Sequence, residues 1–299
     1  LSGGLFHYKS IWKLNFLAGH QQNDMAWLGV TDSLIDIDRR TNSNSNQEKD
    51  RFLQTLTQLK NSWQIGQFSS LETSIYHTFL KGNYGFDFNN FIGLSSTDEL
   101  YNYAFQSNLV GFFSNYTLSK KQFNLISGVH GNIYNRQHTG SEKTIGQLYQ
   151  NTGYKNEISV FTKVDYSLKW FAFFADVQYR YVNFDYKGSV ALQKLDWHFI
   201  NPKAGLSATL NNNYILYYSV GYTGREPTRN DMFSGNDDLL ADSLGNAILS
   251  NANPEFVLNH ELGFRFQKEK MNFNANLYYM DFQNEIVLDG KFGPNGLAL

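Results

Sequence analysis

The residues best suited to binding chemistry lie in one polar segment near position 230. Arg225 and Arg229 are close together in the sequence, and Asn230 follows directly. Guanidinium groups bind anionic oxygens through short, charge-assisted hydrogen bonds, so this cluster could bind an anionic ligand. The same residues could instead form salt bridges that fasten their loop to neighbouring strands. The sequence leaves both roles open.

Other kinds of chemistry find little support in the sequence. The seven histidines are scattered without the spacing of paired metal ligands. The chain has no cysteine, which excludes disulfides and thiolate metal sites. No Gly-x-Ser-x-Gly motif occurs, and no Ser/His/Asp set can be assembled from the spacing. Asp237 and Asp238 lie among Asn, Ser and Gly residues, which favours a solvated loop. We therefore expect no enzymatic activity and no cofactor.

The composition is unusual for a soluble domain. Charged residues make up 17% of the chain, against about 25% in typical soluble domains. Aromatic residues make up 16%, and the net charge of −2 argues against a nucleic-acid partner. No stretch approaches the roughly 18 apolar residues of a membrane helix. The four prolines are few, as long paired strands require, because proline cannot donate to a strand ladder.

A period of two organises the chain, and the hairpin over residues 256–286 shows it clearly. Phe273, Ala275 and Leu277 alternate with asparagines. This period places the apolar and the polar residues on opposite faces of a strand. Strands with one apolar and one polar face, joined by short and long connections in turn, are typical of an outer-membrane β-barrel. The predicted fold class is therefore all-β, an antiparallel transmembrane barrel.

The strand pair over 157–168 and 171–186 indicates which face meets lipid. A charge on the lipid side costs about 2–4 kcal/mol at the membrane midplane, so the charged face must line the lumen. The residues predicted to face the lumen are Lys163, Asp165, Asp176, Arg180, Glu261 and Arg265. Those predicted to face lipid are Val160, Phe173, Val177, Phe264 and Leu277.

Short and long connections alternate along the chain. The remaining strands are expected at 6–18, 52–62, 68–80, 105–118, 123–135, 200–210 and 214–222, which gives about a dozen in all. Long loops are expected at 20–50, 82–102, 136–156, 187–199 and 223–254. Tight turns near Lys120, Lys169, Asn212 and Glu269 are predicted at the periplasmic end, because short connections lie there in such barrels. A soluble sandwich would have shorter strands, of about 5–6 residues.

Five short segments carry a resemblance to a known family. They are AWLGV at 26–30, NPKAGL at 201–206, GREPTRND at 224–231, NPE at 253–255 and NLYYM at 276–280. In their order and spacing the chain resembles TonB-dependent outer-membrane receptors, specifically the iron-type barrels of Bacteroidetes. The resemblance implies a closed barrel of about 22 strands with an N-terminal plug. Residues 1–299 are then expected to be the middle part of the barrel, without the plug and the first and last strands.

This resemblance implies a function and partners. The expected function is TonB-dependent import of a scarce nutrient, a ferric-siderophore complex, across the outer membrane of a Gram-negative bacterium. The expected partners are TonB, through a segment that precedes this sequence, the ligand and outer-membrane lipid. Family recurrence of Arg225 and Arg229 across different substrates suits scaffolding better than selectivity. The haem receptors of the family carry a ligating histidine between segments like 224–227 and 253–255, and none lies there in this sequence.

Two alternatives remain open from the sequence. A passive porin-like channel would lack a plug and a TonB-binding segment. A soluble all-β binding module, such as a lectin, would not need detergent, and its aromatic residues would fall on one interior face of each sheet. The sequence itself does not name the ligand.

Overall fold

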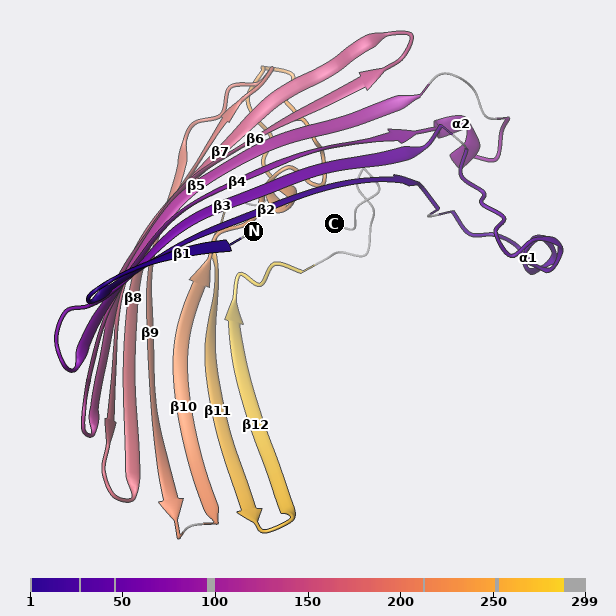
Figure 1. Ribbon diagram of the computed structural model, residues 1–299. Coiled ribbons are helices and arrows are strands. Elements are labelled where there is room, and N and C mark those ends of the chain that lie inside the picture. The colour runs from indigo at the N-terminus through magenta and orange to yellow at the C-terminus, as the bar shows by residue number, and fades with distance from the viewer. Residues whose placement is uncertain are drawn as a thin grey trace.

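A single antiparallel sheet forms the wall of the molecule. The computed structural model describes residues 2–26, 28–45, 47–95, 100–211, 213–250 and 253–287. Within these residues, twelve strands follow one another in chain order, each paired with its neighbours in the sequence. The sheet is strongly curved, with a concave and a convex side (Figure 1). Strands β1 and β12 each pair on one side only, so the sheet does not close among the described residues.

The strands are long and the helices short. The strands are β1 Ser2–His7, β2 Ser10–Asp24, β3 Lys49–Gln64, β4 Ser69–Phe86, β5 Tyr101–Lys120, β6 Phe123–Glu142, β7 Gly146–Ser167, β8 Phe171–Lys187, β9 Leu195–Leu210, β10 Tyr214–Arg225, β11 Glu255–Lys268 and β12 Met271–Gln283. The helices are α1 Asp32–Ile37, α2 Phe88–Phe91 and α3 Arg229–Met232. No helix in the described part of the chain is long and apolar enough to cross a membrane.

The predicted strand order is confirmed, but several predicted boundaries are wrong. The strand expected at 6–18 is two strands, with Tyr8 in a left-handed conformation (φ 46°) at the turn between them. The long loop expected at 136–156 does not exist, because β6 continues to Glu142 and β7 begins at Gly146. Above the lipid-facing band neither face of a strand needs to be apolar. The alternation that marks a strand in the sequence is therefore lost there.

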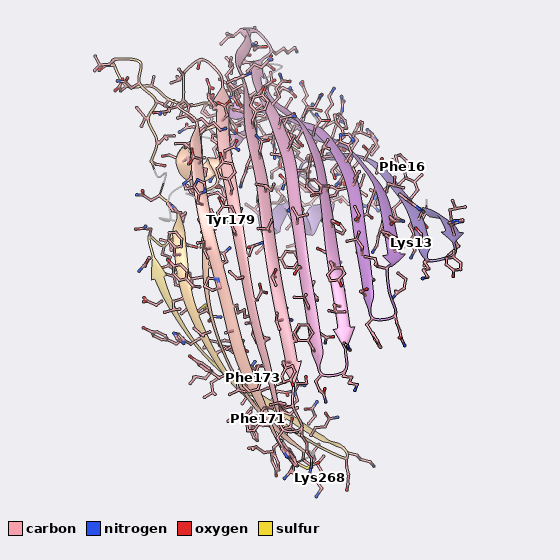
Figure 2. All side chains as sticks on the ribbon, turned by 90° about the vertical axis from the view of Figure 1, so that its left-hand side faces the viewer. Lys13, Phe16, Phe171, Phe173, Tyr179 and Lys268 are labelled. Atoms are coloured by element: carbon pink, nitrogen blue, oxygen red, sulfur yellow. The ribbon has the colours of Figure 1, made fainter. Side chains whose placement is uncertain are left out.

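The convex face of β8 shows the height of the apolar band. From Phe171 to Tyr181 every second residue is apolar or aromatic, and Asn183 follows. This length matches the roughly 9–11 residues that a tilted strand needs to cross a bilayer. Figure 2 views the convex side and shows Phe171, Phe173 and Tyr179 on it. The hairpin of β6 and β7 continues well beyond the matching height, so its upper part extends the wall past the apolar band.

The predicted division of the two faces agrees with the strand register. Residues directly opposite each other on neighbouring strands share a face. Asp176 lies opposite Lys163 on β7 and opposite Lys203 on β9, which places these charges together. Val160 and Val177 alternate with them on the other face, and both are exposed. The charged face is the concave one, which becomes the lumen when such a sheet closes.

The tight turns lie together at one end of the sheet, as predicted, and the long connections lie at the other (Figure 1). Two of the turns use a residue in the left-handed region, Lys121 (φ 52°) and Glu269 (φ 48°). Asn211 does the same (φ 55°), and its side-chain oxygen accepts a hydrogen bond from the backbone N–H of Asn213 at 3.0 Å. Asn212, named in the predicted turn, and Trp27, in the first family segment, lie outside the described residues.

The buried core lies on the concave face, where the connection between β10 and β11 folds back against the wall. We call residues 226–250 of this connection the inner loop. Its Met232, Phe233 and Leu239 pack on side chains of β8 and β9. The wall side of this core consists of Val182, Phe184, Tyr186, Trp197 and Phe199. The inner loop is therefore held against the lumen side of the wall by an apolar cluster.

Candidate functional site

The inner loop begins with a well-capped turn. The hydroxyl of Thr228 accepts a hydrogen bond from the backbone N–H of Asp231 at 3.2 Å, and the Asp231 carboxylate accepts one from the N–H of Thr228 at 2.7 Å. This capping box satisfies backbone donors that a helix start otherwise leaves free. It fixes the direction of α3, which places Arg229 toward the wall and Met232 in the core.

Two carboxylates fasten the inner loop to the wall. Asp237 accepts a hydrogen bond from the hydroxyl of Tyr149 at 2.9 Å. Asp238 accepts hydrogen bonds from the amide of Asn151 at 3.0 Å and from the hydroxyl of Tyr186. The prediction of a solvated acidic loop is therefore wrong. The hydrogen-bond partners of the two carboxylates lie on β7 and β8, far away in the sequence, so no local sequence pattern could indicate them.

Arg225 lies at the end of β10, away from this contact. Its guanidinium forks onto the carboxylate of Glu255, the opposite residue on β11, with Nε 2.7 Å and Nη2 3.2 Å from the two oxygens. This pair ties the two strands together at the point where the inner loop leaves and returns. The geometry is that of the scaffolding alternative, and a ligand-binding role for Arg225 stays a prediction.

Arg229 lies at the centre of the contact between the inner loop and the wall. Its guanidinium donates to the side-chain oxygen of Asn151 at 3.1 Å, to Nε2 of His138 at 3.2 Å and to the backbone carbonyl of Asp237. It also lies over the ring of Phe233, 5.0 Å from the ring centre. Burial lowers the pKa of Arg229, while the charge of Asp237 acts in the opposite direction. Most of its donors are thus used within the protein.

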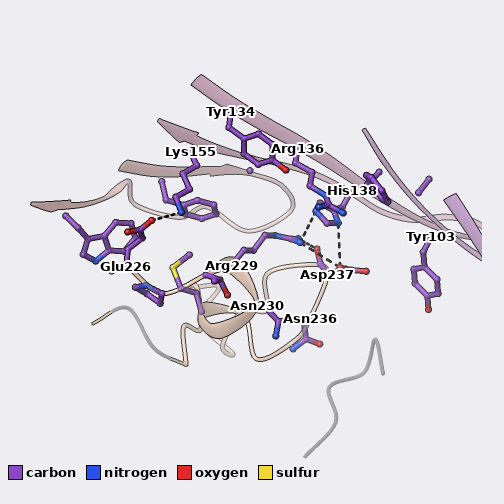
Figure 3. Close-up of a pocket in the computed structure, with 18 of the residues that line it drawn as sticks. Tyr103, Tyr134, Arg136, His138, Lys155, Glu226, Arg229, Asn230, Asn236 and Asp237 are labelled. Carbon is purple, nitrogen blue, oxygen red and sulfur yellow. Dashed lines mark hydrogen bonds and ion pairs between the residues drawn. The ribbon is translucent and has the colours of Figure 1, made fainter. Parts of the chain in front are cut away.

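A cavity of about 500 Å³ lies between the inner loop and the wall (Figure 3). Sites for small molecules usually have volumes of about 300–1,000 Å³. Arg229 and Asn230 of the predicted site line the cavity, and Arg225 does not. The wall contributes Arg136, His138 and Lys155. The structure thus brings two of the three predicted residues together and adds basic residues that the sequence did not single out.

The two acidic side chains that line the cavity each form ion pairs with basic side chains of the protein. The carboxylate of Glu226, almost fully buried, binds Lys155 at 2.5 Å and Arg180 at 2.8 Å. Burial alone would raise the pKa of Glu226, but the hydrogen bonds from Lys155 and Arg180 outweigh it and hold the pKa below its usual value. Asp237 lies 3.8 Å from the guanidinium of Arg229 and 3.6 Å from the ring of His138. Both acidic groups of the cavity are therefore paired with cations of the protein, although Oε2 of Glu226 has no hydrogen-bond partner.

The basic wall residues were missed because the sequence placed them in a loop. Arg136 and His138 belong to β6, where the register puts Arg136 opposite Gly153. A strand prediction that continued past 135 would have placed Tyr134, Arg136 and His138 on one face. That alternation was the available signal, although no apolar partners on the other face supported it.

The chain matches a family model and many solved structures. The family model, described as TonB dependent receptor-like, beta-barrel, matches residues 4–298. The chain is similar to the copper transporter OprC at 11% identity and a TM-score of 0.73, covering 95% of this chain and 45% of OprC. It is similar to the ferric citrate transporter FecA at 11% identity and a TM-score of 0.69, covering 93% of this chain and 41% of FecA.

A further similar structure is the ferric yersiniabactin uptake receptor FyuA from Yersinia pestis, at 12% identity and a TM-score of 0.62, covering 92% of this chain and 44% of FyuA. The chain thus spans less than half the length of these three proteins. At such identities the likeness to the solved structures shows the fold alone. No curated protein matches the chain.

The family is one of receptors and transporters rather than of enzymes. Its match covers nearly the whole sequence and agrees with the meander of long antiparallel strands. The chain belongs to the TonB-dependent receptor-like β-barrel family of Gram-negative outer membranes.

Proposed function

We propose that this protein imports a scarce nutrient across the outer membrane, in a TonB-dependent manner, and that the nutrient is a ferric-siderophore complex or a similar anionic metal chelate. In this proposal residues 1–299 form the middle part of a larger barrel that also contains a plug. TonB binds a segment that precedes this sequence. The observation that carries the proposal is the basic cavity between the inner loop and the lumen side of the wall.

The charge of the cavity supports an anionic ligand. Arg136, Lys155 and Arg229 contribute three positive charges, and Glu226 and Asp237 contribute two negative charges, which leaves one positive charge with His138 neutral. Much of the cavity lining is apolar or aromatic, so this charge acts more strongly than it would in bulk water. Of the three similar structures described above, two are named for ferric chelates and one for copper. These names support a metal-containing nutrient without selecting one.

The three predicted binding residues have different roles in the proposed function. Asn230 lines the cavity and is available for a ligand contact. Arg229 attracts an anion by its charge, while most of its donors hold the inner loop. Arg225 supports the end of β10 through Glu255. Scaffolding is therefore the main role that we assign to the two arginines.

A passive porin-like channel is the competing function. It would conduct without TonB, whereas an active importer would not. The soluble all-β module finds no support once the chain belongs to an outer-membrane family.

Growth of a deletion strain on defined iron sources tests the proposal. We expect the deletion to lose growth on at least one ferric siderophore, and the wild-type gene to restore growth only when TonB is present. Arg229→Ala should lower the amount of heat-modifiable folded barrel, whereas a pure ligand contact would leave the amount unchanged. Normal growth of the deletion on every siderophore, with failure on a vitamin or a glycan, would exclude iron and leave only the importer class.

A further inference from the structure

Arg136 differs from the other basic residues of the cavity in having no acidic partner. Lys155 binds Glu226 at 2.5 Å, and Arg229 lies 3.8 Å from the carboxylate of Asp237. Across the described residues, Arg136 takes part in no ion pair, and its buried Nε has no hydrogen-bond partner. It is therefore the source of the surplus positive charge in the cavity.

The position of Arg136 is fixed by packing rather than by a counter-ion. Its guanidinium lies over the ring of Phe105, 4.1 Å from the ring centre. This cation–π contact keeps the planar group in one orientation against the wall. The opposite residue on β7 is Gly153, so no side chain from that position covers the guanidinium. A partly buried cation without a counter-ion is costly. The Nε is too buried for a ligand to reach, so the terminal nitrogens of Arg136, which have no hydrogen-bond partner among the described residues, are the donors left for a molecule in the cavity.

The rest of the cavity wall is rich in aromatic rings. Tyr84 and Tyr103 both line it, with ring centres 5.2 Å apart and planes tilted by 32°. Phe184 of β8 and Trp197 of β9 also line it. Aromatic rings pack favourably against one another in stacked or edge-to-face arrangements. The cavity thus combines one free guanidinium with surfaces that suit an unsaturated ring.

We propose that Arg136 anchors a carboxylate that is attached to an aromatic ring of the ligand, and that the tyrosine-lined wall holds the ring. The planar guanidinium matches a carboxylate in a forked, two-bond geometry. This inference deepens the proposed function and rests on it, because it assumes that an imported ligand enters the cavity. It assigns ligand recognition to a wall residue, and it leaves Arg229 as the residue that positions the inner loop.

A pair of small probes tests this assignment on protein purified from outer membranes. Salicylate carries a carboxylate on a ring, and salicylamide is its neutral counterpart with nearly the same shape. Binding is measured by ligand-observed NMR in detergent. We expect wild type to bind salicylate at least about tenfold more tightly than salicylamide, because only the carboxylate can form a charged, two-bond pair with the guanidinium.

The variants isolate the guanidinium from packing and from overall charge. Arg136→Met keeps a chain that can cover Phe105, and should reduce the salicylate preference to about none. Arg136→Lys keeps the charge without the fork and should retain part of the preference. The matched control is Arg265→Met, which removes another lumen-facing arginine at a distance from the cavity. Heat-modifiable migration on gels verifies that each variant is folded.

The outcomes separate this inference from the import function. Equal affinity of wild type for the two probes, or an unchanged salicylate preference in folded Arg136→Met, would overturn the role of Arg136. Normal chelate uptake by the same variant would leave the import function intact. An Arg136-dependent preference in a protein that supports no iron uptake would overturn the iron assignment and keep the carboxylate site.

Discussion

Glu226 provides the sharpest test of how the inner loop is held. Its carboxylate joins Lys155 and Arg180, at 2.5 Å and 2.8 Å, and its side chain is only 4% exposed. Breaking a buried ion pair from one side costs about 3–5 kcal/mol, because a charge is left without a partner. An exposed pair contributes about 0–1 kcal/mol. The cost of Glu226→Gln therefore depends on how exposed the two cations remain.

The two cations keep part of their compensation. Arg180 retains Glu157 at 3.2 Å, and the side chain of Lys155 is 38% exposed to solvent. We therefore expect Glu226→Gln to destabilise the attachment of the inner loop by about 1–3 kcal/mol, between the buried and the exposed limits. This range corresponds to an increase of about 5–150-fold in the population with the loop detached.

Limited proteolysis of the folded protein measures this population, because the loop is cleaved only when it leaves the wall. The cleavage rate should rise in Glu226→Gln by the factor given above, with the barrel still heat-modifiable. The control is Glu261→Gln, which removes a lumen-facing carboxylate that accepts a hydrogen bond from Tyr217 and lies outside the inner loop. Equal cleavage of Glu226→Gln and wild type would refute the account of how the loop is attached.

Three other predictions follow from the fold and the charges. Val177→Arg should destabilise the barrel by about 2–4 kcal/mol in urea unfolding if Val177 lies near the midplane, whereas Gln178→Arg should be tolerated, and equal effects would contradict a membrane barrel. A cysteine at Asn236 should react with an impermeant reagent on intact cells, and one at Lys120 should not; the reverse result would invert the topology. The folded-state pKa of Glu226 is lowered, so the stability that its carboxylate gives to the attachment of the inner loop is fully present above the unfolded pKa of about 4.3. This stability is lost as the pH falls through the lower folded pKa. Cleavage of the inner loop should therefore rise only in that acidic range.

The sheet could be predicted because lipid imposes a strict pattern on the strands. On β12 the alternation of Phe273, Ala275 and Leu277 with asparagines shows both the strand and its faces. The same rule does not apply above the apolar band. There, residues such as Arg136 and Tyr149 belong to strands whose two faces are both polar or mixed, and such a segment resembles a loop in the sequence.

The site could be predicted only in part. Arg229 and Asn230 were recognised by residue type, and the structure places both at the cavity. Arg136 was missed because its significance depends on having no partner, which only the tertiary arrangement reveals. The anchoring of Asp237 was missed because its contact with Tyr149 joins two segments that are far apart in the sequence. Local patterns carry no information on such contacts.

TonB-dependent import is tested by the uptake of radioactive iron into cells. Cells that lack the gene, cells that carry it, and cells that carry it but lack TonB are compared on ferric chelates with anionic aromatic groups. Active import predicts that at least one chelate accumulates only when both the protein and TonB are present. Accumulation that continues without TonB, or that is the same with and without the protein for every chelate, would contradict it.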